Sequence, residues 1–125
     1  MPARVLVVDD DLDLLKALNL RLRSAGYEVI SAQDGLTATQ LAVKMQPDVI
    51  ILDIGMPGGD GHVVGRRLRS NPITTTIPVI YLTARDSVTD RHKAQELGAQ
   101  GFLVKPYKNQ ELMSMVARSV AGPSH

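Results

Sequence analysis

The fold is decided by the stretch Val49-Ile50-Ile51-Leu52-Asp53, in which four apolar residues are followed by an acid. Three of the apolar residues are β-branched, and such an uninterrupted run predicts a strand buried on both sides. Residues 55–61 contain four glycines and one proline, a density that neither a strand nor a helix tolerates. Asp53 is therefore expected where a strand of a parallel sheet ends, which is the edge at which such sheets bind ligands.

The same alternation of apolar strand and helix extends over the rest of the chain. Four further strands are predicted at residues 3–8, 27–32, 78–82 and 101–104. Helical periodicity or helix-capping residues predict helices at residues 11–26, 34–46, 62–70, 87–98 and 109–120. The pattern predicts a single-domain, doubly wound α/β fold, with a five-stranded parallel sheet, helices on both faces and right-handed crossovers.

The helix boundaries are predicted from capping residues. Asp10 or Asp11 is expected to cap the first helix, Ser87 the fourth and Asn109 the last. The fourth helix has no clean apolar face, which indicates a mobile element of low local stability.

Several polar residues are predicted to lie on the surface. His62, His92 and His125 lack the spacing of metal ligands and are interpreted as surface residues. The arginines at positions 66, 67 and 69 are interpreted as a solvated helix face.

Composition excludes several classes of function. The 125 residues suffice for one domain, predicted at 1–121, with a tail or a truncated linker at 122–125. The absence of cysteine excludes disulfides and thiolate chemistry, and the net charge of +1 and 3% aromatic content do not favour a nucleic-acid surface. No apolar run is long enough to span a membrane and the N-terminus has no signal peptide pattern, so we expect a cytoplasmic protein without a membrane partner.

Four of the predicted strands end on polar residues whose side chains can bind a metal ion or take part in a reaction. They are Asp9 and Asp10, Asp53, Thr83 and Lys105. In a parallel sheet these ends lie at one edge, so three carboxylates, a hydroxyl and an ammonium are expected to converge. Two like charges about 4 Å apart repel by about 4 kcal/mol at an effective dielectric constant near 20, so the cluster needs a cation. A site with a small number of oxygen ligands that is open to water suits Mg²⁺. A carboxylate beside Mg²⁺ and a lysine is a known type of phosphoryl acceptor.

Four motifs in this chain resemble those of one known family. They are Val-Asp-Asp-Asp at 8–11, Leu-Asp-Ile-Gly-Met-Pro-Gly-Gly-Asp-Gly at 52–61, Leu-Thr-Ala at 82–84 and Phe-Leu-Val-Lys-Pro-Tyr at 102–107. In this order and spacing they are similar to the receiver domain of two-component response regulators, over essentially the whole chain. The resemblance implies a flavodoxin-like fold with strand order 2-1-3-4-5, as in the chemotaxis member of that family.

The resemblance also implies a Mg²⁺ site at the edge of the sheet. Asp10 is expected to bind the ion directly, and Asp9 mostly through water. Asp53 is expected to contribute a carboxylate oxygen, and Gly55 its backbone carbonyl.

Roles in phosphorylation are implied for the remaining residues. Asp53 is expected to be the phosphorylated aspartate, and Thr83 and Lys105 are expected to contact the phosphoryl group. A cis peptide is expected at Lys105-Pro106, since proline lowers the cost of that isomer to about 0.5–1 kcal/mol. Phe102 is expected to be an aromatic switch residue that moves inward together with Thr83.

The implied function is a signalling switch that catalyses only its own phosphorylation and dephosphorylation. A sensor histidine kinase or a histidine phosphotransfer protein is expected to supply the phosphoryl group. The output is expected on the fourth helix, fifth strand and fifth helix, acting on a downstream effector protein or a fused output domain, without direct binding of nucleic acid. A phosphorylation-dependent dimer fits the family, although Gln100-Gly101 replaces the acidic pair at the dimer face of its DNA-binding members.

Other interpretations of the same residues stay open. Taken singly, Asp53 can be a turn cap, Thr83 a strand-end hydroxyl, Lys105 a solvated cation and Phe102 a core residue. One alternative is a phosphatase with an aspartyl-phosphate intermediate. That reaction requires a second Asp as general acid two residues after the nucleophile, where this chain has Gly55. The other is a degenerate receiver that binds partners without phosphorylation. Beryllofluoride with Mg²⁺ distinguishes this last alternative, since only an intact pocket should bind it.

Overall fold

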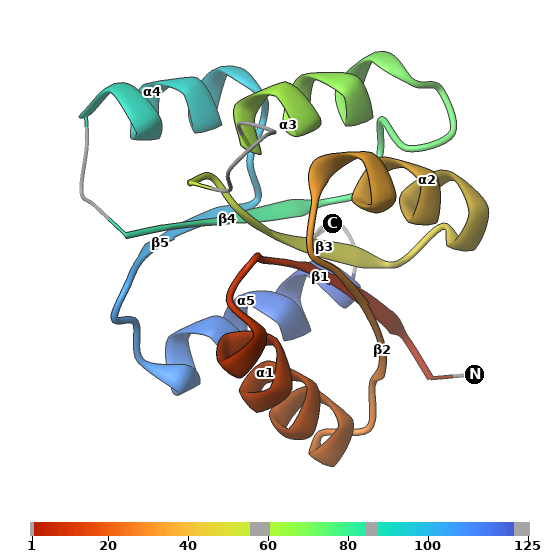
Figure 1. Ribbon diagram of the computed structural model, residues 1–125, viewed down its shortest axis with the longest axis vertical. Helices are drawn as coiled ribbons and strands as arrows, with labels where there is room; N and C mark the ends of the chain where they lie inside the picture. The colour runs from red at the N-terminus through yellow and green to blue at the C-terminus, as the bar shows by residue number, and fades with distance from the viewer. Residues whose placement is uncertain (1, 56–60, 85–87, 122–125) are drawn as a thin grey trace.

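The computed structural model describes residues 2–55, 61–84 and 88–121, and these residues form five strands that alternate with five helices. In chain order the elements are β1 (Arg4–Val8), α1 (Leu12–Ser24), β2 (Glu28–Ala32), α2 (Gly35–Met45), β3 (Val49–Asp53), α3 (Gly61–Ser70), β4 (Val79–Thr83), α4 (Val88–Glu96), β5 (Gly101–Val104) and α5 (Asn109–Val120). The strands form one sheet in the order β2-β1-β3-β4-β5, and all neighbouring pairs are parallel (Figure 1). The predicted doubly wound α/β fold and its strand order are confirmed.

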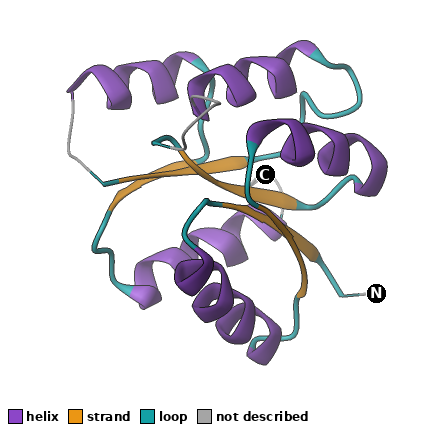
Figure 2. Cartoon of the chain, viewed as in Figure 1, coloured by secondary structure: helices purple, strands orange, loops and turns teal. Residues whose placement is uncertain are grey.

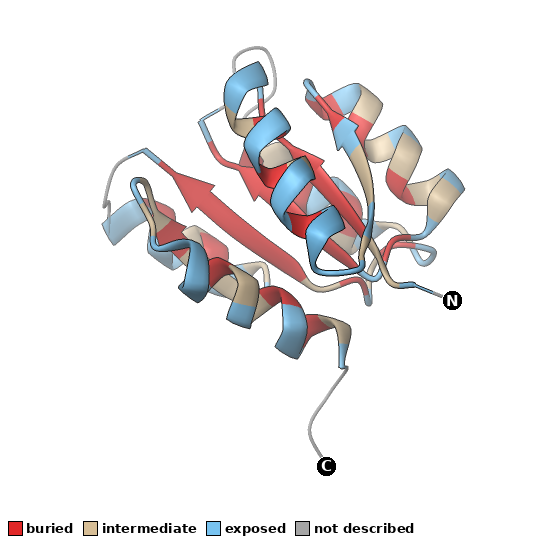
Figure 3. Ribbon diagram, turned by 90° about the horizontal axis from the view of Figure 1, so that it is seen from below, coloured by how far each residue is buried: buried red, intermediate tan, exposed pale blue. Residues whose placement is uncertain are grey.

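Helices cover the sheet on both faces. α1 and α5 lie on one face, and α2, α3 and α4 lie on the other (Figures 1 and 2). Successive residues of a strand point to opposite faces. In β3, Ile50 and Leu52 therefore join the core under α2 and α3, whereas Val49 and Ile51 join the core under α1 and α5. The three central strands β1, β3 and β4 are almost entirely buried, while the helices are buried only on their inner side (Figure 3). Burial on both faces explains why β3 is apolar at consecutive positions.

The helix starts agree with the predicted caps in part. Asp11 caps α1 and Asp34 caps α2, each by accepting hydrogen bonds from backbone N–H groups in the first helical turn. The prediction that Asn109 caps the last helix was wrong by one residue. Asn109 is already helical, because the carbonyl of Lys108 accepts the first hydrogen bonds of α5, and the Lys108 side chain makes no capping bond. The predicted cap Ser87 lies outside the described residues.

α4 is attached to the rest of the fold by few apolar side chains. Within Val88–Glu96 only Asp90 and Ala94 are buried, and Val88 is 84% exposed. The predicted lack of an apolar face is confirmed, so polar contacts must contribute to the position of this helix. No helix within the described ranges has the length and the apolar content needed to cross a membrane.

Two side chains predicted to face solvent do not. His62 is only 2% exposed, and its Nε2 lies 3.2 Å from Asp90 Oδ1 of α4. Arg69 is half-buried and donates hydrogen bonds to backbone carbonyls at the end of α4 and in the loop after α3. Both predictions were wrong because these positions face α4, and polar groups buried between two helices take partners there. His92 is exposed as predicted, and His125 lies outside the described residues.

Candidate functional site

The carboxyl ends of the strands meet at one edge of the sheet. Asp53, the last residue of β3, lies opposite Leu82 of β4, one residue before Thr83. Lys105 follows β5, and its backbone N–H donates to the carbonyl of Thr83 at 2.7 Å. Asp9 follows β1 and stays in the sheet, because its N–H donates to the last carbonyl of β2 at 3.1 Å. Parallel pairing thus places the predicted residues at this edge, as expected from the strand ends.

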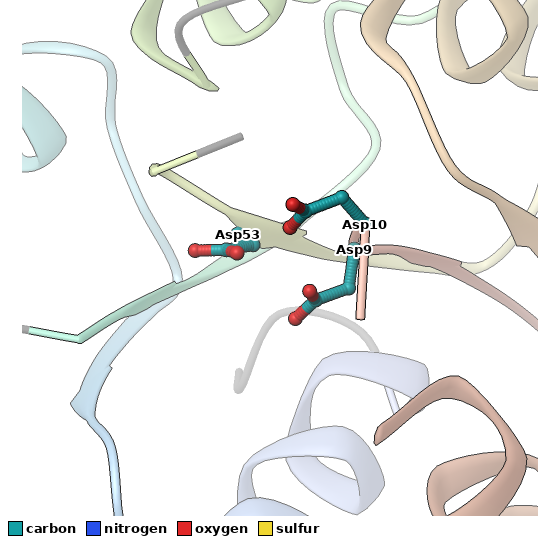
Figure 4. Close-up of side chains that lie close together, drawn as sticks. All are labelled: Asp9, Asp10 and Asp53. Carbon is teal, nitrogen blue, oxygen red and sulfur yellow. The ribbon is translucent and has the colours of Figure 1, made fainter. Parts of the chain in front are cut away.

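Three carboxylates gather at this edge. Asp9, Asp10 and Asp53 each offer an oxygen, and these oxygens lie within 4.8 Å of one another (Figure 4). Asp9 and Asp53 are 1% and 6% exposed, whereas Asp10 is exposed to solvent. The cluster could bind a metal ion, since hard cations take carboxylate oxygens and the exposed side leaves room for water ligands.

Each buried carboxylate is held by one backbone donor and by the same lysine. Asp9 Oδ1 accepts from the N–H of Asp11 at 2.9 Å, and Asp53 Oδ1 accepts from the N–H of Gly55 at 3.1 Å. The other oxygens face Lys105, whose Nζ lies 2.9 Å from Asp9 Oδ2 and 3.4 Å from Asp53 Oδ2. The backbone therefore fixes the orientation of both carboxylates, and the ammonium bridges them.

The electrostatics of the site reflect this crowding. Burial raises the pKa of Asp9 above its ordinary value, and the charge of Asp53 adds to the rise, while hydrogen bonds from Asp11 and Lys105 oppose it. Burial alone lowers the pKa of Lys105, but its hydrogen bond to Asp9 and the charges of both acids outweigh burial, so that pKa lies above its ordinary value. Lys105 is therefore an ammonium at neutral pH, and burial makes the charge of Asp9 unfavourable.

Gly61 allows the start of α3 to lie directly against the end of β3. Its N–H donates to the carbonyl of Ile54 at 3.0 Å. A Cβ atom at this position would lie 2.6 Å from both the carbonyl oxygen of Asp53 and the Cα of Ile54. Only a residue without a side chain fits, so the first residue of α3 is in contact with the backbone of the candidate phosphoacceptor.

The two predicted switch residues lie on neighbouring strands. Thr83 is 2% exposed at the end of β4, and it pairs with Val104 of β5. Phe102 of β5 is partly buried against the core under α2, α3 and α4. The guanidinium carbon of Arg91 from α4 lies 4.8 Å from the centre of its ring, a cation–π contact. The cis peptide expected at Lys105-Pro106 is confirmed.

Two contacts of α4 were missed from the sequence. One is the stacking of Arg91 on Phe102, and the other is the buried pair of His62 and Asp90. The spacing of His62 gave a partial indication that it is buried. It lies three residues before Gly65, a buried residue of α3, and residues three apart share one face of a helix. Nothing in the local sequence around Asp90 indicates that its partner lies 28 residues away.

The arrangement suits transfer of a phosphoryl group. An ionised carboxylate can act as a nucleophile, and Asp53 is presented at a sheet edge beside an ammonium and two further acids. Cations beside the acceptor can neutralise the oxygens of a transferring phosphoryl group, whose transition state spreads charge over them.

Comparisons with known proteins agree on one family. The family model described as the response regulator receiver domain matches residues 5–117. The response regulator PleD of Caulobacter vibrioides is 44% identical over 116 residues, which make up 93% of this chain and 26% of PleD. The chain spans between 26% and 49% of the length of the curated relatives it matches.

Solved structures agree with the sequence relatives. A putative response regulator from Chloroflexus aurantiacus J-10-fl has a TM-score of 0.90 and 40% identity, covering 97% of this chain and 99% of that one. The receiver domain of the sensor histidine kinase PA1611 from Pseudomonas aeruginosa PAO1 has a TM-score of 0.88 and 30% identity, and the match covers 98% of this chain and 100% of that one. The crystal structure of that receiver domain has a magnesium ion coordinated in its active-site cleft.

Proposed function

Since this chain belongs to the family of response regulator receiver domains and is a phosphorylation-activated signalling switch, we propose that Asp53 is its phosphoacceptor. The phosphoryl donor is a sensor histidine kinase or a histidine phosphotransfer protein. The observation that carries the proposal is the position of Asp53, whose carboxylate lies 3.4 Å from the ammonium of Lys105 and within the cluster of three acids.

In the reaction, the carboxylate of Asp53 acts as the nucleophile. A carboxylate oxygen attacks phosphorus, the new O–P bond forms, and the bond from phosphorus to the imidazole nitrogen of the donor breaks with its electron pair staying on the donor. Lys105 neutralises the phosphoryl oxygens, and the Thr83 hydroxyl donates a hydrogen bond to one of them. Dephosphorylation follows when water attacks phosphorus and the O–P bond to Asp53 breaks, which releases inorganic phosphate and restores the carboxylate.

Mg²⁺ is the metal that fits the acid cluster. Asp9, Asp10 and Asp53 would hold it with carboxylate oxygens, directly or through water, and Gly55 would add its backbone carbonyl. Oxygen donors few in number, with one exposed side, are what Mg²⁺ prefers because it keeps several water ligands. When bound, the ion supplies charge neutralisation for phosphoryl oxygens in the transition state.

The output face is formed by α4, β5 and α5. Thr83 moves toward the phosphoryl group, and Phe102 rotates inward into the space beside it, which changes the surface above β5. A downstream effector protein, or an output domain of a longer polypeptide, responds to this change, and phosphorylation-dependent dimerisation through the same face is one form of response. We assign the receiver domain to residues 1–121; some relatives are much longer than this chain, whereas the response regulator from Chloroflexus aurantiacus is covered to 99%.

An aspartyl-phosphate phosphatase is not supported by this site. Such an enzyme needs a side-chain acid two residues after the nucleophile, and Gly55 offers Asp53 only a backbone N–H at 3.1 Å.

Intact mass spectrometry tests the proposal. Acetyl phosphate with Mg²⁺ should add one acid-labile phosphoryl group to the wild-type protein and none to Asp53→Asn. Equal labelling of the two proteins would refute Asp53 as the acceptor.

A further inference from the structure

α3 and α4 lie on the face of the sheet opposite α1 and α5 (Figure 1). A buried polar contact joins these two helices. Nε2 of His62, in the first turn of α3, lies 3.2 Å from Oδ1 of Asp90, in the first turn of α4. The side chains are 3% and 7% exposed. A carboxylate oxygen accepts, so we assign Nε2 as the donor of this contact.

On the α3 side, this contact starts next to the candidate phosphoacceptor. His62 follows Gly61, whose backbone is held on Ile54 by a hydrogen bond of 3.0 Å and leaves no room for a Cβ atom against Asp53. A displacement of the backbone after Asp53 must therefore move the start of α3, and His62 with it, because close-packed groups cannot yield independently.

On the α4 side, the contact ends on a helix that has few buried apolar side chains. Asp90 and Ala94 are its buried residues, so one of its two buried positions is the partner of His62. A buried carboxylate is costly unless it is hydrogen-bonded, so the hydrogen bond from His62 contributes to the position of Asp90. The placement of the first turn of α4 is therefore tied to the placement of His62.

We propose that His62 is a positioning residue, which through its contact with Asp90 transmits the state of Asp53 to α4. This route runs from β3 through the start of α3, whereas the switch described above runs from Thr83 on β4 to Phe102 on β5. The inference rests on the proposed function, since it requires that a phosphoryl group or its analogue binds at Asp53. It assigns two separable responses, one at α4 and one at Phe102.

The two responses can be measured in the same protein. Phe102 is the only phenylalanine of the chain, so incorporation of fluorophenylalanine gives one ¹⁹F ring signal that reports on it. Hydrogen–deuterium exchange of residues 88–96, followed by mass spectrometry, reports on α4. Both are recorded for the full chain with and without Mg²⁺ and beryllofluoride.

The variants separate coupling from simple loss of stability. His62→Leu alone leaves Asp90 buried without this donor, and this change can unfold α4. The double variant H62L/D90L replaces the pair by apolar side chains, an exchange that buried ion pairs often tolerate. His62→Gln keeps a side-chain N–H donor, and Thr83→Ala is the matched change on the other route.

The double variant should keep the beryllofluoride-induced shift of the Phe102 signal, while its exchange response in 88–96 falls by about threefold or more, within the range of coupling between packed elements. His62→Gln should restore part of the α4 response. Thr83→Ala should show the converse, with a reduced Phe102 shift and a retained α4 response.

An α4 response of wild-type size in H62L/D90L would overturn the inference while leaving the proposed function intact. The same holds if His62→Gln and the double variant lose the α4 response equally, since a role in packing rather than in hydrogen bonding would then explain the loss. Absence of any response to beryllofluoride in the wild-type protein would instead overturn the proposed function, and this inference with it.

Discussion

The ammonium of Lys105 lies closer to Asp9, at 2.9 Å, than to Asp53, at 3.4 Å. Asp9 is the more buried of the two acids, and its pKa is raised, first of all by burial. Lys105 therefore compensates the buried charge that the fold itself creates, in addition to facing the acceptor. A cation bound by the acid cluster would take over part of that task and release Lys105 toward Asp53.

Lys105→Met should consequently destabilise the protein more without metal than with it. In EDTA we expect the free energy of unfolding to fall by about 1–2 kcal/mol, because hydrogen bonds to charged groups contribute about 1.5–3 kcal/mol and the lysine side chain is one quarter exposed, at 25%. With saturating Mg²⁺ the loss should shrink. Urea unfolding measures both values, and Lys108→Met, which removes an exposed lysine, is the matched control. The same loss in EDTA and in Mg²⁺ would contradict this account of Lys105.

Asp9→Asn should stabilise the metal-free protein at neutral pH. The pKa of Asp9 is raised in the folded protein above its ordinary value of 3.8, so the protonated acid contributes stability to the fold. This contribution is complete below pH 3.8 and is lost as the pH rises through the folded-state pKa. Asparagine cannot ionise and avoids this loss. Urea unfolding in EDTA should therefore show a gain over the wild type at pH 7 that vanishes as the pH falls toward 3.8.

Asp10→Asn is the comparison for that experiment, because Asp10 belongs to the same cluster but is exposed. It should give a smaller gain at pH 7. Both variants should lose part of the stabilisation by Mg²⁺, which for a ligand at 100 times its dissociation constant is about 2.7 kcal/mol. A gain from Asp9→Asn that persists unchanged at low pH would show that its cause is not the charge of Asp9.

Gly61→Ala should damage the site, whereas Gly55→Ala should be tolerated. An added Cβ at position 61 meets backbone atoms of Asp53 and Ile54 at 2.6 Å, which cannot move aside without displacing the strand end. Overpacking of this kind costs about 1–3 kcal/mol. At position 55 the nearest atom to an added Cβ is Asp53 Oδ1, at an ordinary 3.8 Å. Thermal melting and beryllofluoride titration of the two variants check this, and equal effects at both positions would refute the packing argument.

The parts of the fold that were predictable from the sequence are those set by short-range patterns. Continuous apolar runs mark strands buried on both sides, and the residues after such runs in a parallel sheet must share an edge. Asp9, Asp53 and Lys105 were therefore placed together correctly, although 96 residues separate the first from the last. The boundary at Asn109 was displaced by one residue, since its side chain favours a cap but the carbonyl of Lys108 begins the helix.

The contacts of α4 were not predictable in this way. That helix has almost no apolar periodicity, so its sequence does not show which side faces the protein. His62 was placed on the surface because the three histidines lack the spacing of metal ligands, and its contact with Asp90, 28 residues away, arises from tertiary packing. Arg69 was misplaced for the same reason, since the carbonyls it binds belong to distant turns.

Arg91→Gln should bias the switch at Phe102. The guanidinium of Arg91 lies over the ring at 4.8 Å, and a cation–π contact at an accessible site contributes about 0.5–1 kcal/mol. If Phe102 rotates inward when Asp53 is phosphorylated, this contact is lost, so Arg91 opposes the rotation. Without it, the affinity for beryllofluoride should rise by about 2- to 5-fold, which is the same free energy expressed as a ratio.

The ¹⁹F signal of the single fluorophenylalanine provides the second measurement. In Arg91→Gln it should shift, before any beryllofluoride is added, toward its position in the beryllofluoride-bound wild type, because ligand and substitution favour the same ring orientation. Arg91→Lys keeps a cation and should give a smaller shift, and Arg66→Gln, at an exposed position of α3, should give none. A decrease in beryllofluoride affinity in Arg91→Gln would mean that Arg91 supports the inward orientation, and the direction assigned to this contact would be wrong.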